Sequence, residues 1–332
     1  MSKTILDIAK IAGVAKSTVS RYLNGGSVGE ATKKKIEQAI NETGYSPNPF
    51  AQSLKAKKTN IMGAIVPRLD SYASSQTLIG IDEQLKEMNY QMLISNTSQS
   101  LEREIESIYS FANQKVAGII LLATEVTDQH LQAFEKVKIP VLLIGQEHEA
   151  IHSLIHDDYH AGYAMGRYVL EKGYRNIAYL GVTERDIAVG VKRKQGFEKA
   201  IQEAEECQVQ FFKTDFKIPA AQAAAHKIIS EFRPPIIVCA TDNIALGVLK
   251  AAYSEGLSIP KDIAVTGFGG YEVTEIINPG LTTVKFFYKE AGEKAARNIV
   301  NLVNERQVEK LTISNFEIME RESVDINANH AL

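Results

Sequence analysis

Short apolar segments alternate with longer amphipathic segments from residue 61 onward, and this alternation constrains the fold more than any other feature. Short apolar runs are typical of strands buried on both faces, whereas apolar residues three or four apart indicate helices packed on a sheet. We therefore predict an α/β fold with parallel sheets for this part of the chain. The expected strands are 61–66, 91–95, 118–122, 141–144, 176–180, 209–212, 236–239 and 263–267, and the expected helices include 76–88, 101–113, 161–172, 194–204, 220–231 and 243–255.

So many strands, each followed by a helix, exceed what one compact open sheet usually holds, so residues 60–332 are expected to form two lobes. The chain is expected to cross between the lobes near 145–158, 280–288 and 310–325. Two such lobes leave a cleft, and ligands of open parallel sheets bind beyond the carboxyl ends of the strands. The candidates for effector binding are therefore side chains that follow strands, namely Arg193, Asp242, Phe216, Gln146 and Tyr72.

The chemistry of these candidates suits a sugar. Arg193 and Asp242 can each hold two hydroxyl groups, and Phe216 offers an aromatic face. Taken singly, each could equally be a surface charge or a ring of the core. Their common placement after strands favours a sugar-binding cleft.

Residues 1–46 have a different pattern, that of three short helices. The first helix is expected to end at Gly13, a second follows directly, and a third covers 31–43. The offsets of four and six between Ala9, Gly13 and Val19 suit a helix-turn-helix. In that motif a small residue lies where the helices touch, a glycine supplies positive φ in the turn, and a β-branched residue packs back.

The second of these helices carries polar residues on its outward face. Lys16, Ser17 and Arg21 are expected to read base edges in the major groove, because this is the part of a recognition helix that reaches them. Short polar side chains suit phosphate oxygens, and we assign this role to Thr4, Thr18, Ser20 and Asn24. The alternative is a pair of ordinary surface helices in a small bundle.

Charge is divided unevenly along the chain. Residues 1–58 hold ten Lys and Arg against four acids, a net charge of +6, which leaves 27 against 36, or −9, for residues 59–332. A basic module on an acidic body is typical of a nucleic-acid-binding head, since Lys and Arg supply affinity for phosphates. Double-stranded DNA is therefore the expected partner.

Residues 47–59 read as a hinge with weak helical potential, because two prolines break the chain before a short polar stretch. Leu54 is an apolar side chain among lysines, which is unusual for a solvated linker. Apolar wedges between base steps kink the minor groove, and we assign Asn48, Ala51 and Leu54 to such a contact. Alternatively, Leu54 packs on its own module.

Several function classes lack their sequence signatures. We find no phosphate-binding P-loop, dinucleotide fingerprint, nucleophile elbow or zinc-protease helix, so neither an enzyme nor a cofactor is expected. His148, His152, His156 and His160 recur every four residues, but the stretch reads as extended, which would hold them about 13 Å apart, so no metal site is expected. The start has no apolar signal segment and no run could span a bilayer, so a cytoplasmic protein without a membrane partner is expected.

The first helices resemble the DNA-binding head of the lac repressor and galactose repressor family. The similarity is carried by Thr4 to Ala9, Ala12-Gly13-Val14 and Ser17 to Asn24, and it continues through Gly44 to Asn48 and Ala51 to Leu54. It extends over the whole chain, with Asp242 to Gly247 matching the second-lobe signature and Arg321 to Val324 the usual ending of the family.

The resemblance implies a homodimer with two heads on a near-palindromic operator and with paired Leu54 side chains wedged at its centre. It also implies a core like that of periplasmic binding proteins, in which an effector changes the angle between the lobes and so orders or melts the hinge helices. By motif position, Lys16, Ser17 and Arg21 correspond to base-reading residues, and Arg193, Asp242 and Phe216 to effector-binding ones. The implied function is a sugar-responsive transcriptional repressor, and the alternative is a global carbon regulator whose core is read by a partner protein.

Three positions and the C-terminal end depart from the family pattern. Ala15 replaces a usual serine, and Gly145 and Gly269 stand where many members carry effector-binding aspartates. No leucine heptad follows Val324, so a tetramer is not expected. Within the family, residues 181–190 and 267–271 are most similar to repressors of sucrose-utilisation genes, while Lys192 beside Arg193 would also tolerate a sugar phosphate.

Overall fold

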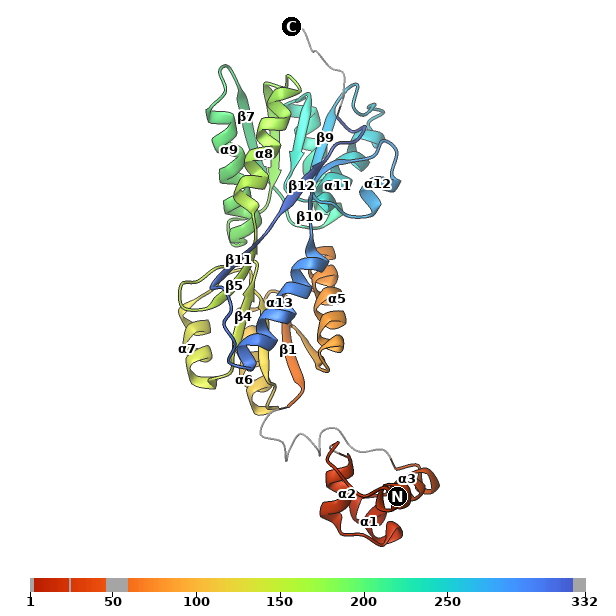
Figure 1. Ribbon diagram of the computed structural model, residues 1–332. Helices are drawn as coiled ribbons and strands as arrows, with labels where there is room; N and C mark the ends of the chain where they lie inside the picture. Colours follow the sequence, from red (N-terminus) through yellow and green to blue (C-terminus); the bar gives the residue numbers. More distant parts are fainter. Residues whose placement is uncertain (1–2, 24, 46–58, 325–332) are drawn as a thin grey trace. The chain divides into compact units, whose positions relative to one another are not determined.

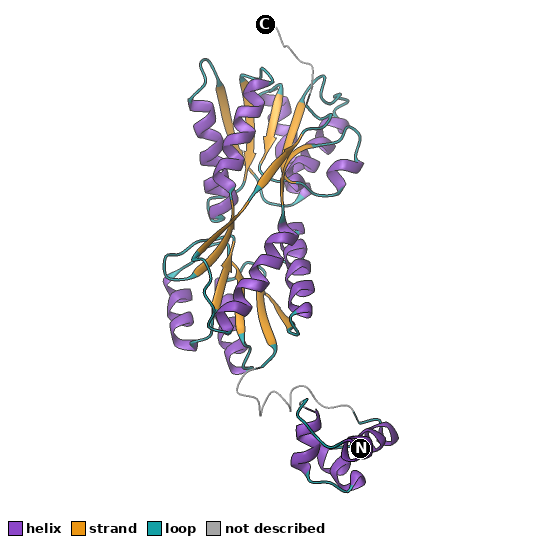
Figure 2. Ribbon diagram, viewed as in Figure 1, coloured by secondary structure: helices purple, strands orange, loops and turns teal. Residues whose placement is uncertain are grey.

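The computed structural model describes residues 3–23, 25–45 and 59–324. The chain divides into two compact units, Met1–Asn60 and Ile61–Leu332, which are taken one at a time. Figure 1 labels their helices and strands, and Figure 2 separates helix, strand and loop by colour. We refer to the first unit as the head and to the second as the core.

The head is a three-helix unit made of α1 (Ile5–Ala12), α2 (Lys16–Leu23) and α3 (Glu30–Thr43). Its apolar centre contains Ile8, Val19 and Ile36, none of which is exposed at all, one from each helix. Because each helix contributes a buried β-branched residue to one small core, the three elements are held together despite their short lengths. The predicted helix-turn-helix is confirmed.

Two glycines and one capping pair set the ends of these helices. Gly13 and Gly44 end α1 and α3 in the left-handed conformation, with φ of 65° and 61°. At the other end of α1, the Asp7 carboxylate accepts hydrogen bonds from the backbone N–H and the hydroxyl of Thr4, both at 2.8 Å. Tyr22 joins α2 to α3 by donating its hydroxyl proton to Glu37 Oε1 at 2.8 Å.

The first lobe of the core is a six-stranded sheet in the order β11-β5-β4-β3-β1-β2, with every neighbouring pair parallel. Successive residues of its strands face opposite sides, so Ala64 of β1 packs with one layer of helices and Ile65 with the other. The elements of this lobe are β1 (Ile61–Val66), α5 (Tyr72–Glu87), β2 (Gln91–Asn96), α6 (Leu101–Asn113), β3 (Gly118–Leu122), α7 (Asp128–Val137), β4 (Val141–Ile144), β5 (His152–His156), α13 (Tyr288–Val303) and β11 (Leu311–Ser314).

The second lobe has a sheet of the same size in the order β12-β10-β9-β8-β6-β7. Its largest buried side chains are Tyr179, Phe197 and Phe268, which lie in one continuous apolar cluster. The elements are α8 (Asp158–Glu171), β6 (Asn176–Gly181), the π-helix η1 (Ile187–Lys192), α9 (Arg193–Gln202), β7 (Gln208–Lys213), α10 (Ile218–Glu231), β8 (Ile236–Cys239), α11 (Asp242–Ser254), β9 (Ala264–Gly269), α12 (Val273–Ile276), β10 (Thr282–Phe286) and β12 (Phe316–Met319).

Three crossovers join the lobes, from β5 to α8, from β10 to α13 and from β11 to β12 (Figure 1). The last explains one departure from the expected parallel sheets, because β12 is antiparallel to β10. The parallel strands of both lobes end at the cleft. A chain that leaves the first lobe along β11 therefore enters the second lobe moving away from the cleft, against the direction of its neighbours.

Several helices begin earlier than the sequence predicted. Helix α5 starts at Tyr72 instead of 76, α8 at Asp158 instead of 161, and α10 at Ile218 instead of 220. The first turns of α5 and α8 are polar, so they lack the apolar spacing on which the prediction relied, and capping by the side chains of Ser71 and Asp157 holds them. Tyr72 and Asp242 are consequently in first helical turns and not in loops.

Close pairs of helices in each lobe meet at glycines. A Cβ at Gly80 of α5 would lie 2.0 Å from the carbonyl oxygen of Lys289 on α13, and a Cβ at Gly292 would lie 2.1 Å from that of Thr77. The second lobe repeats this arrangement between α8 and α9, at Gly162 and Gly196. Glycine is therefore what allows these helix backbones to touch. No helix among residues 3–23, 25–45 and 59–324 is long and apolar enough to cross a membrane.

Candidate functional site

The outward face of α2 carries the residues expected to read DNA. Lys16, Ser17 and Arg21 are exposed, whereas Val19 on the opposite face is fully buried. The helix is thus oriented by its apolar side, and Lys16, Ser17 and Arg21 face solvent. This is the placement that a recognition helix needs to insert into a major groove.

The residues assigned to phosphate contacts have more varied surroundings. Thr4 is exposed but shares its hydroxyl with the capping interaction of α1, and Thr18 and Ser20 are half-buried on α2. Asn24 lies outside the described residues, as do Asn48, Ala51 and Leu54 and all of the expected hinge except Thr59. The minor-groove assignment therefore stays a prediction.

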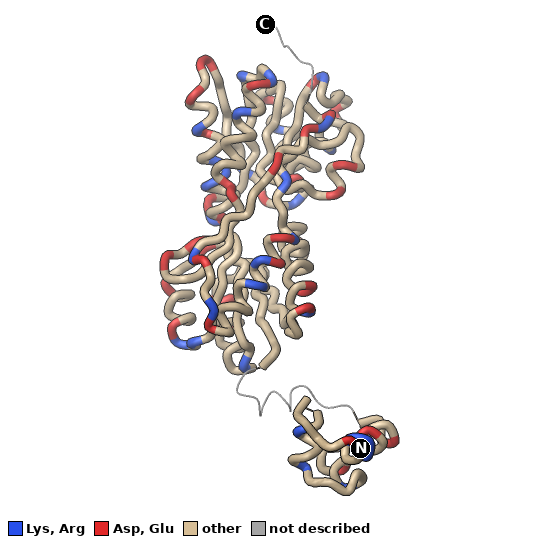
Figure 3. The backbone as a smooth tube through the Cα atoms, in the orientation of Figure 1, with Lys and Arg blue, Asp and Glu red and all other residues tan. Residues whose placement is uncertain are grey.

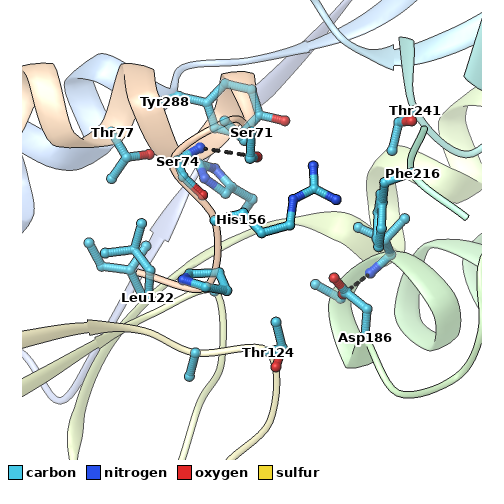
Figure 4. A pocket seen from close by; sticks show the side chains of 18 of the residues that line it. Ser71, Ser74, Thr77, Leu122, Thr124, His156, Asp186, Phe216, Thr241 and Tyr288 are labelled. Carbon is cyan, nitrogen blue, oxygen red and sulfur yellow. Dashed lines mark hydrogen bonds between the residues drawn. The ribbon is translucent and has the colours of Figure 1, made fainter. Parts of the chain in front are cut away.

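A pocket in the core lies between the lobes, where the carboxyl ends of the strands of both sheets meet (Figure 4). Its walls combine neutral polar and aromatic side chains with aliphatic and charged ones. The first lobe contributes Arg68, Ser71, Ser74, Thr77, Thr124 and Gln146, the crossover contributes His156 and Asp158, and the second lobe contributes Asp186, Arg193, Phe216, Thr241, Asn243 and Tyr271, among others.

Arg193 lies in this pocket but is already engaged by the protein. Its guanidinium donates to Asp158 Oδ1, from Nε at 3.0 Å and from Nη2 at 2.5 Å, and Nη1 donates to the carbonyl oxygen of Ala240. It also lies over the rings of Phe268 and Phe286, about 5 Å from each centroid. The pair is almost completely buried, so Asp158 fixes the orientation of the arginine for a ligand in the pocket.

Asp242 lies behind the pocket wall and is not among the residues that line it. Its carboxylate accepts hydrogen bonds from the Thr283 hydroxyl at 2.5 Å and from the Tyr271 backbone N–H at 2.9 Å. Complete burial raises the pKa of Asp242 to about 6, although these hydrogen bonds act in the opposite direction. In this structure Asp242 holds the loop that carries Tyr271.

Tyr72 is likewise outside the lining and stacks on Tyr271, with ring centroids 4.2 Å apart and planes inclined by 30°. This contact joins α5 of the first lobe to the loop after β9 of the second. A Cβ at Gly269 would lie 2.3 Å from the Tyr271 ring. The tyrosine ring thus needs a glycine at the position where the family resemblance led us to expect an aspartate in many members.

Gln146 and Phe216 were predicted to lie in the cleft because they follow strands, and both line the pocket. Gln146 is buried, and Phe216 is half-buried with the Arg68 guanidinium 5.4 Å from its ring centroid. Arg68 belongs to the first lobe and Phe216 to the second. A third contact between the lobes is the ion pair of Lys192 with Glu147 at 2.5 Å.

Sequence reasoning did not single out several polar residues of the pocket, among them His156, Asp158 and Asp186. His156 was considered only as a metal ligand, and the extended backbone that argued against this is confirmed, because residues 152–156 form β5. Among the residues that the structure describes, no group of His, Cys, Asp and Glu could hold a metal ion. A usable signal was the run His156-Asp157-Asp158 directly at the expected crossover between the lobes.

A helix-turn-helix head followed by a two-lobed core with a pocket between its lobes defines a DNA-binding regulator controlled by a small molecule. Residues 4–48 match the model for bacterial regulatory proteins of the lacI family, and residues 59–322 match that for periplasmic binding proteins and the sugar-binding domain of the LacI family. The chain belongs to the LacI family.

Known relatives cover almost the entire chain. It is 40% identical to the sucrose operon repressor of Staphylococcus xylosus over 95% of this chain and 98% of that protein. It is 30% identical to the transcriptional repressor PurR of Vibrio atlanticus over 97% and 98%. A structure of the lac repressor dimer bound to operator and the anti-inducer ONPF is similar in fold, with a TM-score of 0.90, 22% identity and coverage of 98% and 99%.

Proposed function

We propose that this protein is a transcriptional repressor that binds a palindromic operator as a dimer and responds to sucrose or a closely related sugar. The observation that carries the proposal is the combination, in one chain, of an exposed basic recognition helix with a polar pocket between two lobes. The 40% identity to a sucrose operon repressor supports sucrose as the effector. The pocket would bind and release its ligand without chemical change, and the protein would act with the DNA in the cytoplasm.

In this proposal Lys16, Ser17 and Arg21 read base edges, and Thr4, Thr18, Ser20 and Asn24 hold phosphates. Asn48, Ala51 and Leu54 contact the minor groove at the centre of the operator. The hinge at residues 47–59 separates the DNA-binding residues from the effector-binding and dimerisation core. These assignments follow from the family motif and from the exposure of the described members.

Exposed apolar side chains on both lobes support a second copy of the chain as the partner. In the first lobe Leu69, Ile79 and Ile94 are 42–48% exposed, and in the second lobe Tyr253 and Ile276 are 48% and 80% exposed. Elsewhere on the core, basic and acidic residues are interspersed over the outer helices (Figure 3). Subunit interfaces are formed by contiguous exposed apolar patches, and in this proposal these side chains contribute to the dimer contact.

The effector would act through the contacts that join the lobes around the pocket. Arg193 and Phe216 offer a polar and an aromatic surface for the sugar, with Gln146 opposite, while Tyr72 and Asp242 support the wall through Tyr271. Since Tyr72–Tyr271, Arg68–Phe216 and Lys192–Glu147 each connect one lobe to the other, a bound sugar that shifts any of them changes the lobe angle.

The proposal is tested by fluorescence anisotropy on DNA upstream of the protein's own gene at fixed salt, with and without sucrose and fructose. Arg193→Ala is expected to abolish the response to the sugar while operator affinity is kept. Because this variant leaves Asp158 buried without its partner, Phe216→Ala, which breaks no ion pair, serves as a second test. Arg167→Ala, an exposed arginine on α8, is the matched control. A normal sugar response in both pocket variants would refute the assigned site.

A further inference from the structure

His156 is a half-buried polar residue of the pocket, and neither the family motif nor the sequence analysis gave it a role in ligand binding. Its Nδ1 atom is buried, and no described residue lies within hydrogen-bond distance of it. The ring is held between Phe286 and Tyr288, at centroid distances of 5.3 and 5.0 Å. A buried ring nitrogen without a partner is costly, so its presence at the pocket indicates that a ligand supplies the missing hydrogen bond.

The imidazole is uncharged at neutral pH. Burial lowers the pKa of His156 to about 4, and the nearby Arg193 charge acts in the same direction while Asp158 opposes it. A neutral imidazole has one donor and one acceptor nitrogen, and so matches a hydroxyl group, which also donates and accepts. A phosphate dianion only accepts hydrogen bonds, and a neutral imidazole offers it no positive charge.

Each of the three cations described at or beside the pocket, Arg68, Lys192 and Arg193, has a carboxylate neighbour. Arg193 is paired with Asp158, Arg68 lies 3.1 Å from Asp70, and Lys192 lies 2.5 Å from Glu147. Asp186 also lines the pocket, and its carboxylate accepts a hydrogen bond from the Val189 backbone N–H at 2.9 Å. A phosphoryl group carries about −1.5 to −2 charges at neutral pH, so it would meet paired cations and an additional carboxyl group.

The remaining polar lining consists of groups suited to neutral hydroxyls. Figure 4 shows His156 facing the cavity, with Ser71, Ser74 and Thr77 toward the first lobe and Asp186, Phe216 and Thr241 toward the second. Hydroxyl side chains can exchange donor and acceptor roles with the hydroxyls of a sugar. The Phe216 ring provides the apolar surface that the C–H face of a sugar requires.

We propose that the pocket is selective for an uncharged, polyhydroxylated sugar over the corresponding sugar phosphate, and that His156 is a hydroxyl-binding residue within it. This inference rests on the proposed function, in which the pocket holds a sugar effector. It goes further by excluding a sugar phosphate as the effector. The sequence analysis had allowed a sugar phosphate because Lys192 adjoins Arg193. Lys192 is instead directed to Glu147 of the opposite lobe.

The test is isothermal titration calorimetry of the full chain with sucrose, fructose and glucose and with sucrose 6-phosphate, fructose 6-phosphate and glucose 6-phosphate. One neutral sugar is expected to bind at least ten-fold more tightly than its phosphate ester. Equal or tighter binding of a phosphate, or no binding of any neutral sugar, would overturn the charge argument. Asp186→Asn keeps an oxygen for the Val189 N–H, and it is expected to bring the two affinities closer together.

The role of His156 is tested with the neutral sugar that binds. His156→Phe keeps a ring between Phe286 and Tyr288 but removes both nitrogens, and is expected to weaken binding about ten-fold, the effect of one buried hydrogen bond. His156→Gln retains a donor and an acceptor and is expected to lose less. The control is His226→Gln, at a surface ion pair with Glu255 on α10 and α11. If His156→Phe binds the sugar as tightly as the native protein, His156 is not a ligand-binding residue.

The two proposals can fail separately. A neutral sugar that binds in the calorimeter but does not change operator affinity would contradict the proposed regulatory function and leave the ligand selectivity standing. A sugar phosphate that releases or tightens operator binding, when the neutral sugar does neither, would support regulation by the pocket and contradict the selectivity.

Discussion

At the scale of single residues, one group in the pocket and one behind its wall have pKa values shifted in opposite directions, and both shifts favour the uncharged form. His156 is held neutral by burial, with its pKa near 4, and the pKa of Asp242 is raised to about 6. Neither shift follows from residue type. Both arise because these side chains are surrounded by rings and backbone at the junction of two sheets, which the sequence does not display.

These shifts predict a specific pH dependence of stability. Unfolded histidine binds a proton near pH 6.5, whereas folded His156 binds one only near pH 4. Acidification from pH 7 to pH 5 therefore lowers the free energy of unfolding by about 2 kcal/mol through this group. Asp242 has the opposite effect, because its pKa is higher in the folded than in the unfolded protein. Between pH 7 and pH 5 it raises the free energy of unfolding by about 1 kcal/mol.

Replacement of His156 by Gln should therefore reverse the trend. Urea unfolding of the core at pH 7 and pH 5 is expected to show the native protein losing stability on acidification and the His156→Gln variant gaining it. A variant that loses as much stability as the native protein would mean that His156 is protonated in the fold.

Among the individual residues of the site, sequence patterns located those at strand ends and missed those at the crossover. Gln146, Phe216 and Arg193 line the pocket, because the ends of parallel strands converge at one edge of each sheet. Asp158 could not be assigned, since its role depends on an arginine 35 positions away that packing brings within 3.0 Å. Tyr72 and Asp242 lie outside the lining, because the Tyr72 ring stacks on Tyr271 and the Asp242 carboxylate is bonded to Thr283 and to the Tyr271 backbone.

At the scale of elements, glycine contacts between helices determine where the pocket residues lie. Helices α8 and α9 carry Asp158 and Arg193 in their first turns, and Gly162 brings the two backbones together. A Cβ at Gly162 would lie 2.0 Å from the carbonyl oxygen of Arg193 itself. The separation of these helices therefore sets the position of the arginine relative to its carboxylate partner.

The variant Gly162→Ala is expected to be destabilised by about 2 kcal/mol, because overpacking against backbone exceeds the gain of about 1 kcal/mol in helix propensity. It should also bind the sugar at least ten-fold more weakly, as measured by calorimetry. The control is Gly118→Ala at the start of β3, where the new Cβ would meet the side chain of Ile299 at 2.9 Å. Equal sugar affinity in both variants would show that the α8–α9 spacing does not position Arg193.

Element types were predictable from periodicity, whereas the topology of the last strands was not. The alternation of apolar runs and helices indicated β1 to β4 and β6 to β9, including β2 and β7, which lie at sheet edges and contain no fully buried residue. Strands β11 and β12 have mixed polarity and follow α13 closely, and they belong to different sheets. Nothing in their composition distinguishes a strand that continues a lobe from one that crosses to the other.

At the scale of the whole molecule, two sites lie in separate compact units of one chain. The head presents exposed basic and hydroxyl groups on α2, and the core encloses a pocket between lobes that are joined by three crossovers. If the pocket ligand changes operator affinity by some factor, thermodynamic linkage requires the operator to change ligand affinity by the same factor. This reciprocity separates true coupling from independent binding by two linked units.

The most direct measurement is therefore the dissociation constant of the operator complex with and without saturating sucrose, together with that of sucrose with and without saturating operator, all at one salt concentration. The account predicts that sucrose changes operator affinity and that the two ratios are equal. Sucrose that binds the core but leaves operator affinity unchanged would contradict it.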